Sequence, residues 1–261
     1  MKALRIAASG MMAQEMNVEL ISNNVANMRT TGFKRQRADF QDLLYQDMRR
    51  VGTQTSESGG ILPTGVQIGS GVRTAATPRI HSQGTLSSTE KETDVAVRGE
   101  GYFRVLLPDG RTAYTRDGSF ELDARGTLVT ADGWSVDPAI TVPANSSGLT
   151  VNAQGVVQVT VGTASAPTTI GQLQLARFVN KSGLEAIGNN LFVETASSGA
   201  PQVANPGDEG YGTLLQAHLE AGNVNSVAEI SDLIAAQRAY EMNSRVIRAA
   251  DEMMSASVSP K

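Results

Sequence analysis

The chain has 261 residues and no cysteine, with 22 basic and 26 acidic residues and a formal net charge of -4. This balance gives no electrostatic case for binding nucleic acid or an acidic membrane surface, and the missing cysteine excludes disulfides, thiolate metal sites and a cysteine nucleophile. No apolar run approaches the roughly 20 residues of a membrane span, so we expect no membrane insertion.

The first predicted element is a long helix over residues 3–28. Its apolar side chains recur at the spacings of three and four residues that a helix-packing seam requires. Gly32 follows it and suits the left-handed conformation that ends many helices. Gln14, Glu15 and Asn17 interrupt the apolar stretch, so we expect no cleaved signal peptide. The seam residues are Leu4, Ala7, Met11, Val18, Ile21, Val25 and Met28.

A second, short helix is predicted over residues 39–50. Its acidic residues come early and its arginines late, which complements the helix dipole. The following residues 53–71 are rich in Gly, Ser and Thr and predict an extended segment or loop. A loop of that length is usually functional or ordered by a partner. The apolar residues on one face of the short helix are Phe40, Leu43, Leu44 and Met48.

Residues 72–195 show a series of short strand signals separated by turns. Asp-Gly pairs at positions 109–110, 117–118 and 132–133 predict tight turns, and Gly99-Glu100-Gly101 predicts a bend or bulge before a strand at Tyr102. Turns spaced about 8 to 12 residues apart indicate antiparallel β structure, as a sandwich or barrel of one domain. The strand signals lie at residues 94–98, 102–107, 119–122, 127–130, 157–161 and 173–178.

A loop over residues 195–213 leads to a C-terminal helix that opens with the capping-box spacing of Ser226 and Glu229. This helix carries a seam like the first one, and a seam has to bury itself against something. Because polar residues interrupt both seams, we expect the two ends to be marginally stable until neighbouring copies cover them. The C-terminal seam residues are Leu233, Ala236, Tyr240, Ile247 and Met254, with Ala250 interleaved.

These elements predict an α+β fold, with long N- and C-terminal helices packing as a coiled-coil-like bundle and a central antiparallel β domain. We expect a terminal helical assembly domain of residues 1–32 and 222–261. Residues 33–75 and 196–221 form the expected connecting region, with the short helix and the extended segment. Residues 76–195 form the expected β-rich outer domain.

Catalytic and metal-binding patterns are missing from the sequence. His81 and His218 have no metal-ligand spacing, and we interpret each as a surface or hydrogen-bonded histidine. A glycosidase pair such as Asp117 with Asp123 stays open, although nothing singles it out. No phosphate-binding loop or nucleophile elbow is present. We therefore expect no enzyme, no cofactor and no bound metal.

The basic cluster Lys34-Arg35-Gln36-Arg37 follows the first helix. Such a cluster can be a solvated turn, or it can bind phosphate or an acidic partner surface. A solvated turn is the default interpretation. Because the first seam ends here, a subunit contact is the preferred functional alternative.

Longer motifs cover nearly the whole chain. They include Ile6-Ala-Ala-Ser-Gly-Met-Met-Ala13, Ile21-Ser-Asn-Asn-Val-Ala-Asn27, Thr31-Gly-Phe-Lys-Arg35, Asp94-Val-Ala-Val-Arg-Gly-Glu-Gly-Tyr-Phe103, Tyr114-Thr-Arg-Asp-Gly-Ser-Phe120, Leu128-Val-Thr-Ala-Asp-Gly133, Asn223-Val-Asn225 and Ile234-Ala-Ala-Gln-Arg-Ala-Tyr-Glu-Met-Asn243.

Together these motifs resemble the bacterial flagellar rod and hook protein family. The resemblance implies a non-enzymatic axial subunit, exported unprocessed through the flagellar type III export apparatus and polymerised helically into a hollow, rigid drive shaft across the periplasm. Length, the single β domain and residues 45–69 are most similar to the distal rod members. The implied partners are other copies of the chain, proximal rod proteins, the hook protein, and the L-ring and P-ring proteins.

In this family the stretch that resembles residues 46–65 separates a stiff rod from a bendable hook. The resemblance therefore implies a rod-stiffening segment that includes Gln46, Leu62, Pro63 and Gly65. The helices of neighbouring copies would form the inner tube and the β domain would lie outside. Two alternatives stay open: a hook or proximal rod subunit of the same family, and a secreted β-rich binding or carbohydrate-active domain with incidental helical ends.

Overall fold

The computed structural model of the chain describes residues 2–52, 64–162 and 166–258. The chain divides into two compact units. Unit 1 comprises Met1–Val25, Gln36–Pro78 and Ser226–Lys261, and unit 2 comprises Ala26–Arg35 and Arg79–Asn225. Two long helices and many antiparallel strands confirm the α+β class.

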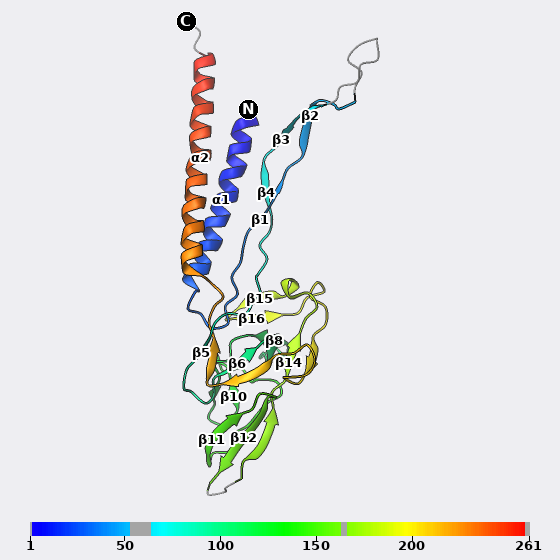
Figure 1. The fold of residues 1–261 in the computed structure, drawn as a ribbon, viewed down its shortest axis with the longest axis vertical. Helices are drawn as coiled ribbons and strands as arrows, with labels where there is room; N and C mark the ends of the chain where they lie inside the picture. Colours follow the sequence, from blue (N-terminus) through cyan, green and yellow to red (C-terminus); the bar gives the residue numbers. More distant parts are fainter. Residues whose placement is uncertain (1, 53–63, 163–165, 259–261) are drawn as a thin grey trace. The chain divides into compact units, whose positions relative to one another are not determined.

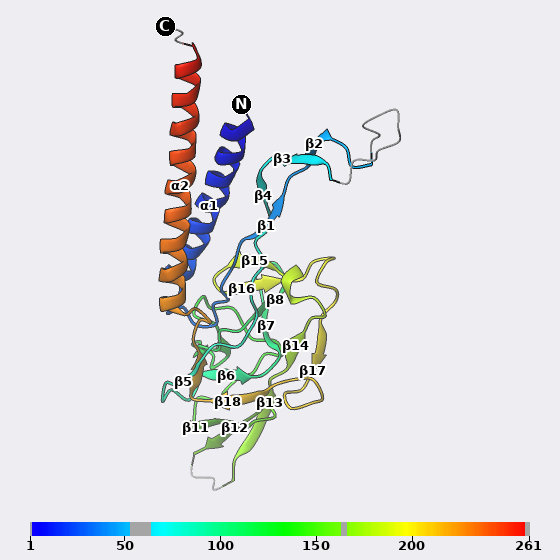
Figure 2. The ribbon, with the colours of Figure 1, turned by 45° about the horizontal axis from the view of Figure 1, so that its top comes forward.

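Unit 1 contains both helices, which lie side by side in Figures 1 and 2. α1 spans Lys2–Ala26 and α2 spans Ser226–Val258, so the two predicted terminal helices are present. Beyond the end of α1, Gly32 has a φ of 68°, the left-handed conformation expected there. The described stretches of both helices are too polar to cross a membrane.

A two-stranded ribbon in unit 1 replaces the short helix predicted over residues 39–50, so that prediction was wrong. β1 (Asp39–Asp42) pairs antiparallel with β4 (Val72–Ala76), and β2 (Tyr45–Arg49) pairs antiparallel with β3 (Val66–Gly69), as Figure 2 shows. The distant segment satisfies the backbone hydrogen bonds that a helix would have formed internally. A helix would also have needed a core for its apolar face, whereas Leu44 and Met48 are exposed in the ribbon.

Unit 2 is built of short strands that pair antiparallel throughout the described residues, as predicted. A 3-10 turn at Lys181–Gly183 joins two of them. The strands are β5 (Leu86–Ser88), β6 (Val95–Arg98), β7 (Tyr102–Leu106), β8 (Thr112–Thr115), β9 (Glu121–Leu122), β10 (Leu128–Val129), β11 (Ser146–Val151), β12 (Val156–Val161), β13 (Thr168–Gln172), β14 (Leu175–Arg177), β15 (Glu185–Gly188), β16 (Leu191–Val193), β17 (Gln202–Ala204), β18 (Thr213–Gln216) and β19 (His218–Glu220).

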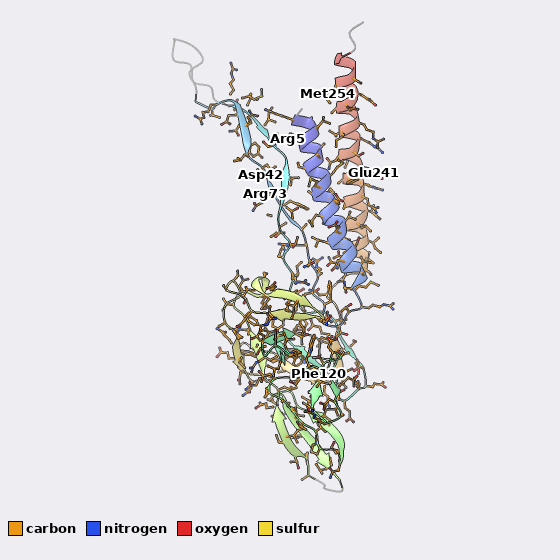
Figure 3. All side chains as sticks on the ribbon, turned by 180° about the vertical axis from the view of Figure 1, so that it is seen from behind. Arg5, Asp42, Arg73, Phe120, Glu241 and Met254 are labelled. Atoms are coloured by element: carbon orange, nitrogen blue, oxygen red, sulfur yellow. The ribbon has the colours of Figure 1, made fainter. Side chains whose placement is uncertain are left out.

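The strands of unit 2 are distributed over several small sheets around an apolar core. The largest sheet has six strands in the order β15-β16-β8-β7-β14-β17, and a second sheet has the order β11-β12-β13. Phe103 and Phe120 are both 0% exposed and meet edge to face, with ring centroids 5.1 Å apart. Figure 3 shows Phe120 among closely packed side chains. This core gives unit 2 a rigid interior.

Glycines shape the turns of unit 2. Gly110 and Gly133 have φ values of 84° and 83°, which confirms the tight turns predicted at two Asp-Gly pairs. Gly118 in the third pair has a different role, because a Cβ there would lie 1.7 Å from the carbonyl oxygen of Val95. The bend predicted at residues 99–101 is also present, with positive φ at both of its glycines.

Candidate assembly surfaces and a buried joint

The seam residues of α1 lie on its less exposed side. Ala7 and Ile21 are buried, with 4% and 5% of their surface exposed, whereas Met12 is 70% exposed. Met28 lies beyond the end of α1 and belongs to unit 2. The partly buried members of this seam are Leu4, Met11, Val18 and Val25.

The seam residues of α2 show the same graded burial. Ala236 and Ala250 are buried, whereas Tyr240 is 44% exposed. Leu233, Ile247 and Met254 are partly buried. The less exposed positions of α2 therefore recur at spacings of three and four residues, as on α1.

Two contacts between α1 and α2 define how the helices face each other. Asn24 Nδ2 donates a hydrogen bond to Glu229 Oε2 at 3.1 Å, and both side chains are buried. Gly10 faces Asn243 so closely that a Cβ on the glycine would lie 2.8 Å from the Asn243 amide nitrogen. The two contacts are two heptads apart on each helix. The helices therefore run antiparallel in a single register.

Between these two contacts the helices leave a groove of about 500 Å³ that is open to solvent. Val18 and Tyr240 line it from the two seams. Three carboxylates, from Glu15, Glu19 and Glu241, also line it, together with Gln237. Close packing is the normal state of a helix interface, so the middle of the seam is unfilled within one chain.

The base of the ribbon is fastened to α1. The Gln36 backbone exchanges two hydrogen bonds with Asn24, which donates to the Gln36 carbonyl oxygen at 2.8 Å and accepts from its N–H at 2.9 Å. Further along, the Val72 N–H donates to Ser9 Oγ at 3.2 Å. The segments that contain Gln36 and Val72 are thus held at two points of α1.

The outer part of the ribbon, β2 and β3, exposes apolar side chains. Leu44, Tyr45 and Met48 are 87%, 57% and 66% exposed, and Gln46 between them is also exposed. In Figure 3 few other side chains surround the ribbon near Asp42. Isolated two-stranded ribbons are marginal in water, so this surface needs a cover. Gly65 lies just before β3, whereas Leu62 and Pro63 lie outside the described residues.

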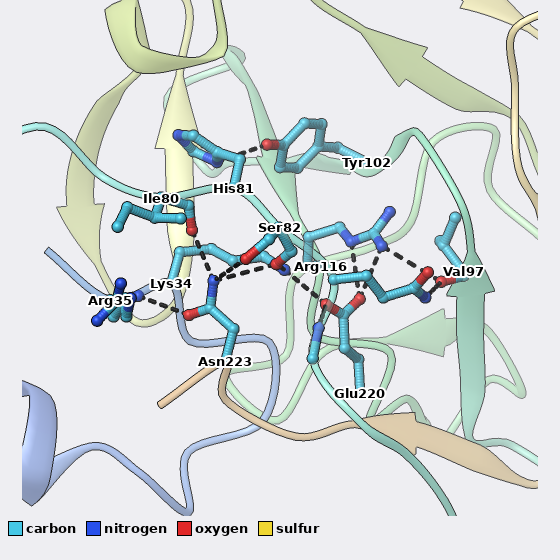
Figure 4. A network of polar contacts seen from close by, with 12 residues as sticks. Lys34, Arg35, Ile80, His81, Ser82, Val97, Tyr102, Arg116, Glu220 and Asn223 are labelled. Atoms are coloured by element: carbon cyan, nitrogen blue, oxygen red, sulfur yellow. Dashed lines mark hydrogen bonds and ion pairs between the residues drawn. The ribbon is translucent and has the colours of Figure 1, made fainter. Parts of the chain in front are cut away.

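A buried charge cluster in unit 2 was not predicted from the sequence. The Lys34 ammonium lies 2.5 Å from Glu220 Oε1, and Arg116 donates from Nε to Glu220 Oε2 at 2.9 Å (Figure 4). All three side chains are 5% exposed or less. Burial lowers the pKa of Lys34, against the opposing effect of the Glu220 charge. Lys34 is therefore neither in a solvated turn nor available for a subunit contact. Arg37 of the same cluster is exposed, so a subunit contact through the rest of the cluster stays a prediction.

Asn223 extends this cluster. Its Nδ2 donates to the carbonyl oxygens of Ile80 and Ser82 at 2.7 and 3.1 Å, and its Oδ1 accepts from the Arg35 N–H at 2.8 Å. The four side chains of Lys34, Arg116, Glu220 and Asn223 are called the joint below. Asn223 belongs to the Asn223-Val-Asn225 motif found in the sequence, whereas no sequence pattern indicated a role for Glu220.

The two histidines are structural. His81 Nδ1 shares a hydrogen bond of 2.8 Å with the Tyr102 hydroxyl, and its ring meets Phe192 edge to face. Burial, aided by the positive charge of Lys34, lowers the pKa of His81 to about 4. His218 Nδ1 lies 2.8 Å from the carbonyl oxygen of Gln216. Each histidine therefore makes a hydrogen bond, as interpreted, although the buried Nε2 of His81 has no hydrogen-bond partner among the described residues.

The aspartates considered as a glycosidase pair are turn residues. Asp117 Oδ1 accepts from the N–H and the hydroxyl of Ser119 at 3.0 and 2.7 Å. Asp123 Oδ1 accepts from two backbone N–H groups of its own turn, both at 2.8 Å. These bonds use the carboxylates to close turns. Within the described ranges no cluster of three or more His, Asp or Glu residues is placed to hold a metal ion.

Family models match three parts of the chain. A model of the flagella basal body rod protein matches residues 4–34, and a model of the flagellar hook protein FlgE/F/G D1 domain matches residues 96–159. A model of the C-terminal part of the flagellar basal body rod FlgEFG protein matches residues 215–259. Both helical ends are therefore part of the matched sequence.

Full-length relatives are rod proteins. The chain is 56% identical to the flagellar basal-body rod protein FlgG of Caulobacter vibrioides, over 98% of each chain. It is 49% identical to the FlgG protein of Agrobacterium fabrum, over 98% of this chain and 97% of the relative. The flagellar hook protein FlgE of Treponema pallidum is 42% identical, but over only 49% of this chain and 27% of that protein.

Proposed function

This chain belongs to the flagellar basal-body rod and hook protein family, and we propose that it polymerises through its terminal helices into the hollow, rigid shaft that transmits torque to the hook. It is a structural subunit of the distal rod and not an enzyme. The helical ends are not incidental, since family models match both of them. The hook alternative has less support, because the hook relative matches only about half of this chain.

The unfilled groove between α1 and α2 carries this proposal. Val18 and Tyr240 are seam residues, yet the space between them stays open in a single chain. A second copy that covers Val18 and Tyr240 gains free energy, because contact replaces the hydration of these two apolar side chains. A contact between different surfaces of identical subunits, repeated with a screw rotation, gives an open filament.

Val18→Asp tests the role of the groove. An added carboxylate beside Glu15 and Glu19 would have to be buried among like charges when a neighbour enters, which opposes assembly. We expect the variant to fold in unit 2 but to give no rods in electron micrographs of isolated basal bodies. Val179→Asp makes the same change at a residue of unit 2 that is 84% exposed, and it should assemble normally. Normal rods from the Val18 variant would contradict the proposal.

Residues 46–65 are proposed as the rod-stiffening segment, which includes Gln46, Leu62, Pro63 and Gly65. Gln46 lies in β2 and Gly65 just before β3, whereas Leu62 and Pro63 lie outside the described residues. The exposed apolar residues of the outer ribbon, and the fastening of the ribbon's base to α1, support a bridge to a neighbouring copy. Deleting residues 46–65 should turn a straight rod into a bent or unstable one. A straight rod of unchanged stability after this deletion would remove the stiffening role.

Partners and location follow from the same proposal. The neighbours are other copies, proximal rod proteins and the hook protein, and the L-ring and P-ring proteins surround the shaft. Export through the flagellar type III apparatus, without cleavage of the first helix, is part of this proposal. Residues 1–32 and 222–261 are the proposed assembly domain, residues 33–75 and 196–221 the connection, and residues 76–195 the outer domain.

A further inference from the structure

The chain crosses between the two units at four places, after Val25, Arg35, Pro78 and Asn225. Any force that passes along the chain between the units must therefore enter unit 2 through segments next to these crossings. The segments are residues 26–35, the stretch that begins at Arg79, and the stretch that ends at Asn225. How firmly unit 2 holds these three segments decides whether force reaches its core or peels a segment away.

Backbone hydrogen bonds tie the three segments to one another inside unit 2. The Gly32 N–H donates to the carbonyl oxygen of Glu220 at 2.7 Å, and the Ile80 N–H donates to that of Arg35 at 2.9 Å. The Asn223 N–H donates to the carbonyl oxygen of Phe33 at 3.3 Å. Each of the three segments is thus bonded to at least one of the others.

The side chains of the joint reinforce these ties. Glu220 receives Lys34 on one carboxylate oxygen and Arg116 on the other (Figure 4). The Lys34 ammonium also donates to the Ser82 carbonyl oxygen at 2.8 Å. The amide of Asn223 holds the Arg35 N–H on one side and the Ile80 carbonyl oxygen on the other. All three segments therefore meet at two side chains, Glu220 and Asn223.

Arg116 anchors the tied segments to the body of unit 2. Its Nη1 donates to the carbonyl oxygens of Gly99 and Gly101 at 2.9 and 2.5 Å, and its Nη2 donates to that of Val97 at 3.3 Å. Val97 is a core residue, 0% exposed. Charge-assisted hydrogen bonds between buried groups are short and strong. The path from the chain crossings to the core thus runs through Glu220 and Arg116.

We infer that the joint is the mechanical coupling of this subunit, a clamp that passes force between the terminal segments and the β core. Glu220 and Arg116 position the clamp, and Asn223 closes it over the segment at Ile80. The inference rests on the proposed torque-transmitting role for its biological meaning. The clamp itself is a property of the single chain and is testable without any assembled rod.

Single-molecule pulling of the full chain tests the clamp directly, because the chain has no cysteine of its own. In the first geometry, cysteine linkers at both termini pull on α1 and α2 and load the joint. In the second geometry, Ala124→Cys and Ala200→Cys, both at exposed positions of unit 2, load the sheets without pulling on the terminal segments. The measured quantity is the force at which unit 2 opens.

Asn223→Ala removes the amide from the clamp and leaves the buried charges paired. We expect it to lower the opening force in the first geometry and to leave it unchanged in the second. Asn180→Ala is the matched control, since Asn180 Nδ2 donates to the Ser197 carbonyl oxygen at 3.0 Å, away from the joint. Lys34→Met is the second variant, and it should show the same dependence on direction while Arg116 still neutralises Glu220.

The dependence of the opening force on the pulling geometry distinguishes a clamp from side chains that only stabilise unit 2. The joint is not the mechanical coupling if both variants lower the opening force equally in the two geometries. It is also not the coupling if they lower the force in neither geometry. Rod assembly plays no part in this measurement. A chain that fails to polymerise but keeps the direction dependence would overturn the proposed function alone.

Discussion

Glu220 is the residue on which the chemistry of unit 2 depends most. One carboxylate lies between two buried cations, Lys34 and Arg116, and its 0% exposed side chain leaves no solvent to replace either partner. A buried ion pair contributes little net free energy compared with an apolar core, but removing one partner is costly because the other charge stays buried. The cluster is thus more important as a constraint on geometry than as a source of stability.

Glu220→Gln should therefore destabilise unit 2 strongly, by about 3–5 kcal/mol, since it leaves two cations without their counterion. Lys34→Met should cost less, because Glu220 keeps Arg116. Urea unfolding followed by the fluorescence of Trp134, the one tryptophan, measures both changes. Equal destabilisation by the two variants would show that the carboxylate is not the centre of the cluster.

His81 gives unit 2 a pH dependence. Its pKa is lowered to about 4 by burial and by the charges of Lys34, Lys181 and Arg79, against a smaller opposing effect of Glu100. Between pH 6.5 and 4 the unfolded chain binds a proton at this ring while the folded chain does not. Stability should therefore fall as the pH decreases through this window, by up to about 3 kcal/mol in the free energy of unfolding.

His81→Gln should remove this contribution while keeping a hydrogen-bonding partner for the Tyr102 hydroxyl. Unfolding curves of both chains at pH 7.0 and 4.5 make the comparison, and His218→Gln is the control. A wild-type curve that shifts no more than that of His81→Gln would contradict the assignment.

At the residue scale the sequence could not reveal the joint. Lys34 and Glu220 are 186 positions apart, and neither lies in a pattern that indicates burial. Lysine in a basic run is usually solvated, so the cluster 34–37 pointed to the surface. Only the fold, which brings the chain crossings together within unit 2, supplies the carboxylate that makes its burial tolerable.

At the element scale periodicity predicted the helices but not the ribbon. The seams of α1 and α2 repeat over several heptads, and a pattern of that length seldom occurs outside a helix. The four apolar residues of segment 39–50 fit a helical face equally well, yet β3 and β4 supply strand partners from residues 66–76. Short segments are decided by such distant pairing, which no local pattern contains.

Asn24 of α1 forms hydrogen bonds to α2 and to the segment that contains Gln36. Replacing it should therefore destabilise all three elements of unit 1. Asn24→Ala removes one hydrogen bond from the buried Glu229 carboxylate and two from the Gln36 backbone. A loss of about 1–3 kcal/mol in the free energy of unfolding is expected. Thermal melting of the helices by circular dichroism at 222 nm should move to lower temperature.

Asn17→Ala is the matched control on the same helix, because it keeps the Asn24 contacts intact. Its helices should melt close to the wild-type temperature. If Asn24→Ala and Asn17→Ala melt together, the contact between Asn24 and Glu229 does not hold the helix pair.

At the scale of the whole molecule the two units differ in how fully they bury their own apolar side chains. Unit 2 buries aromatic residues such as Phe103 and Phe120 completely. Unit 1 leaves a groove between its helices and exposes apolar residues on its ribbon. A single chain therefore forms a closed aromatic core in unit 2, whereas unit 1 presents surfaces that gain stability from a neighbour.

Electron cryomicroscopy of isolated basal bodies, at a resolution that shows side chains, tests the central claim most directly. We expect the helices of neighbouring copies to form the inner wall of the rod, with the groove between Val18 and Tyr240 filled by side chains of another copy. A rod in which this groove stays open to solvent, or in which the helices lie outside the β units, would contradict the assembly described here.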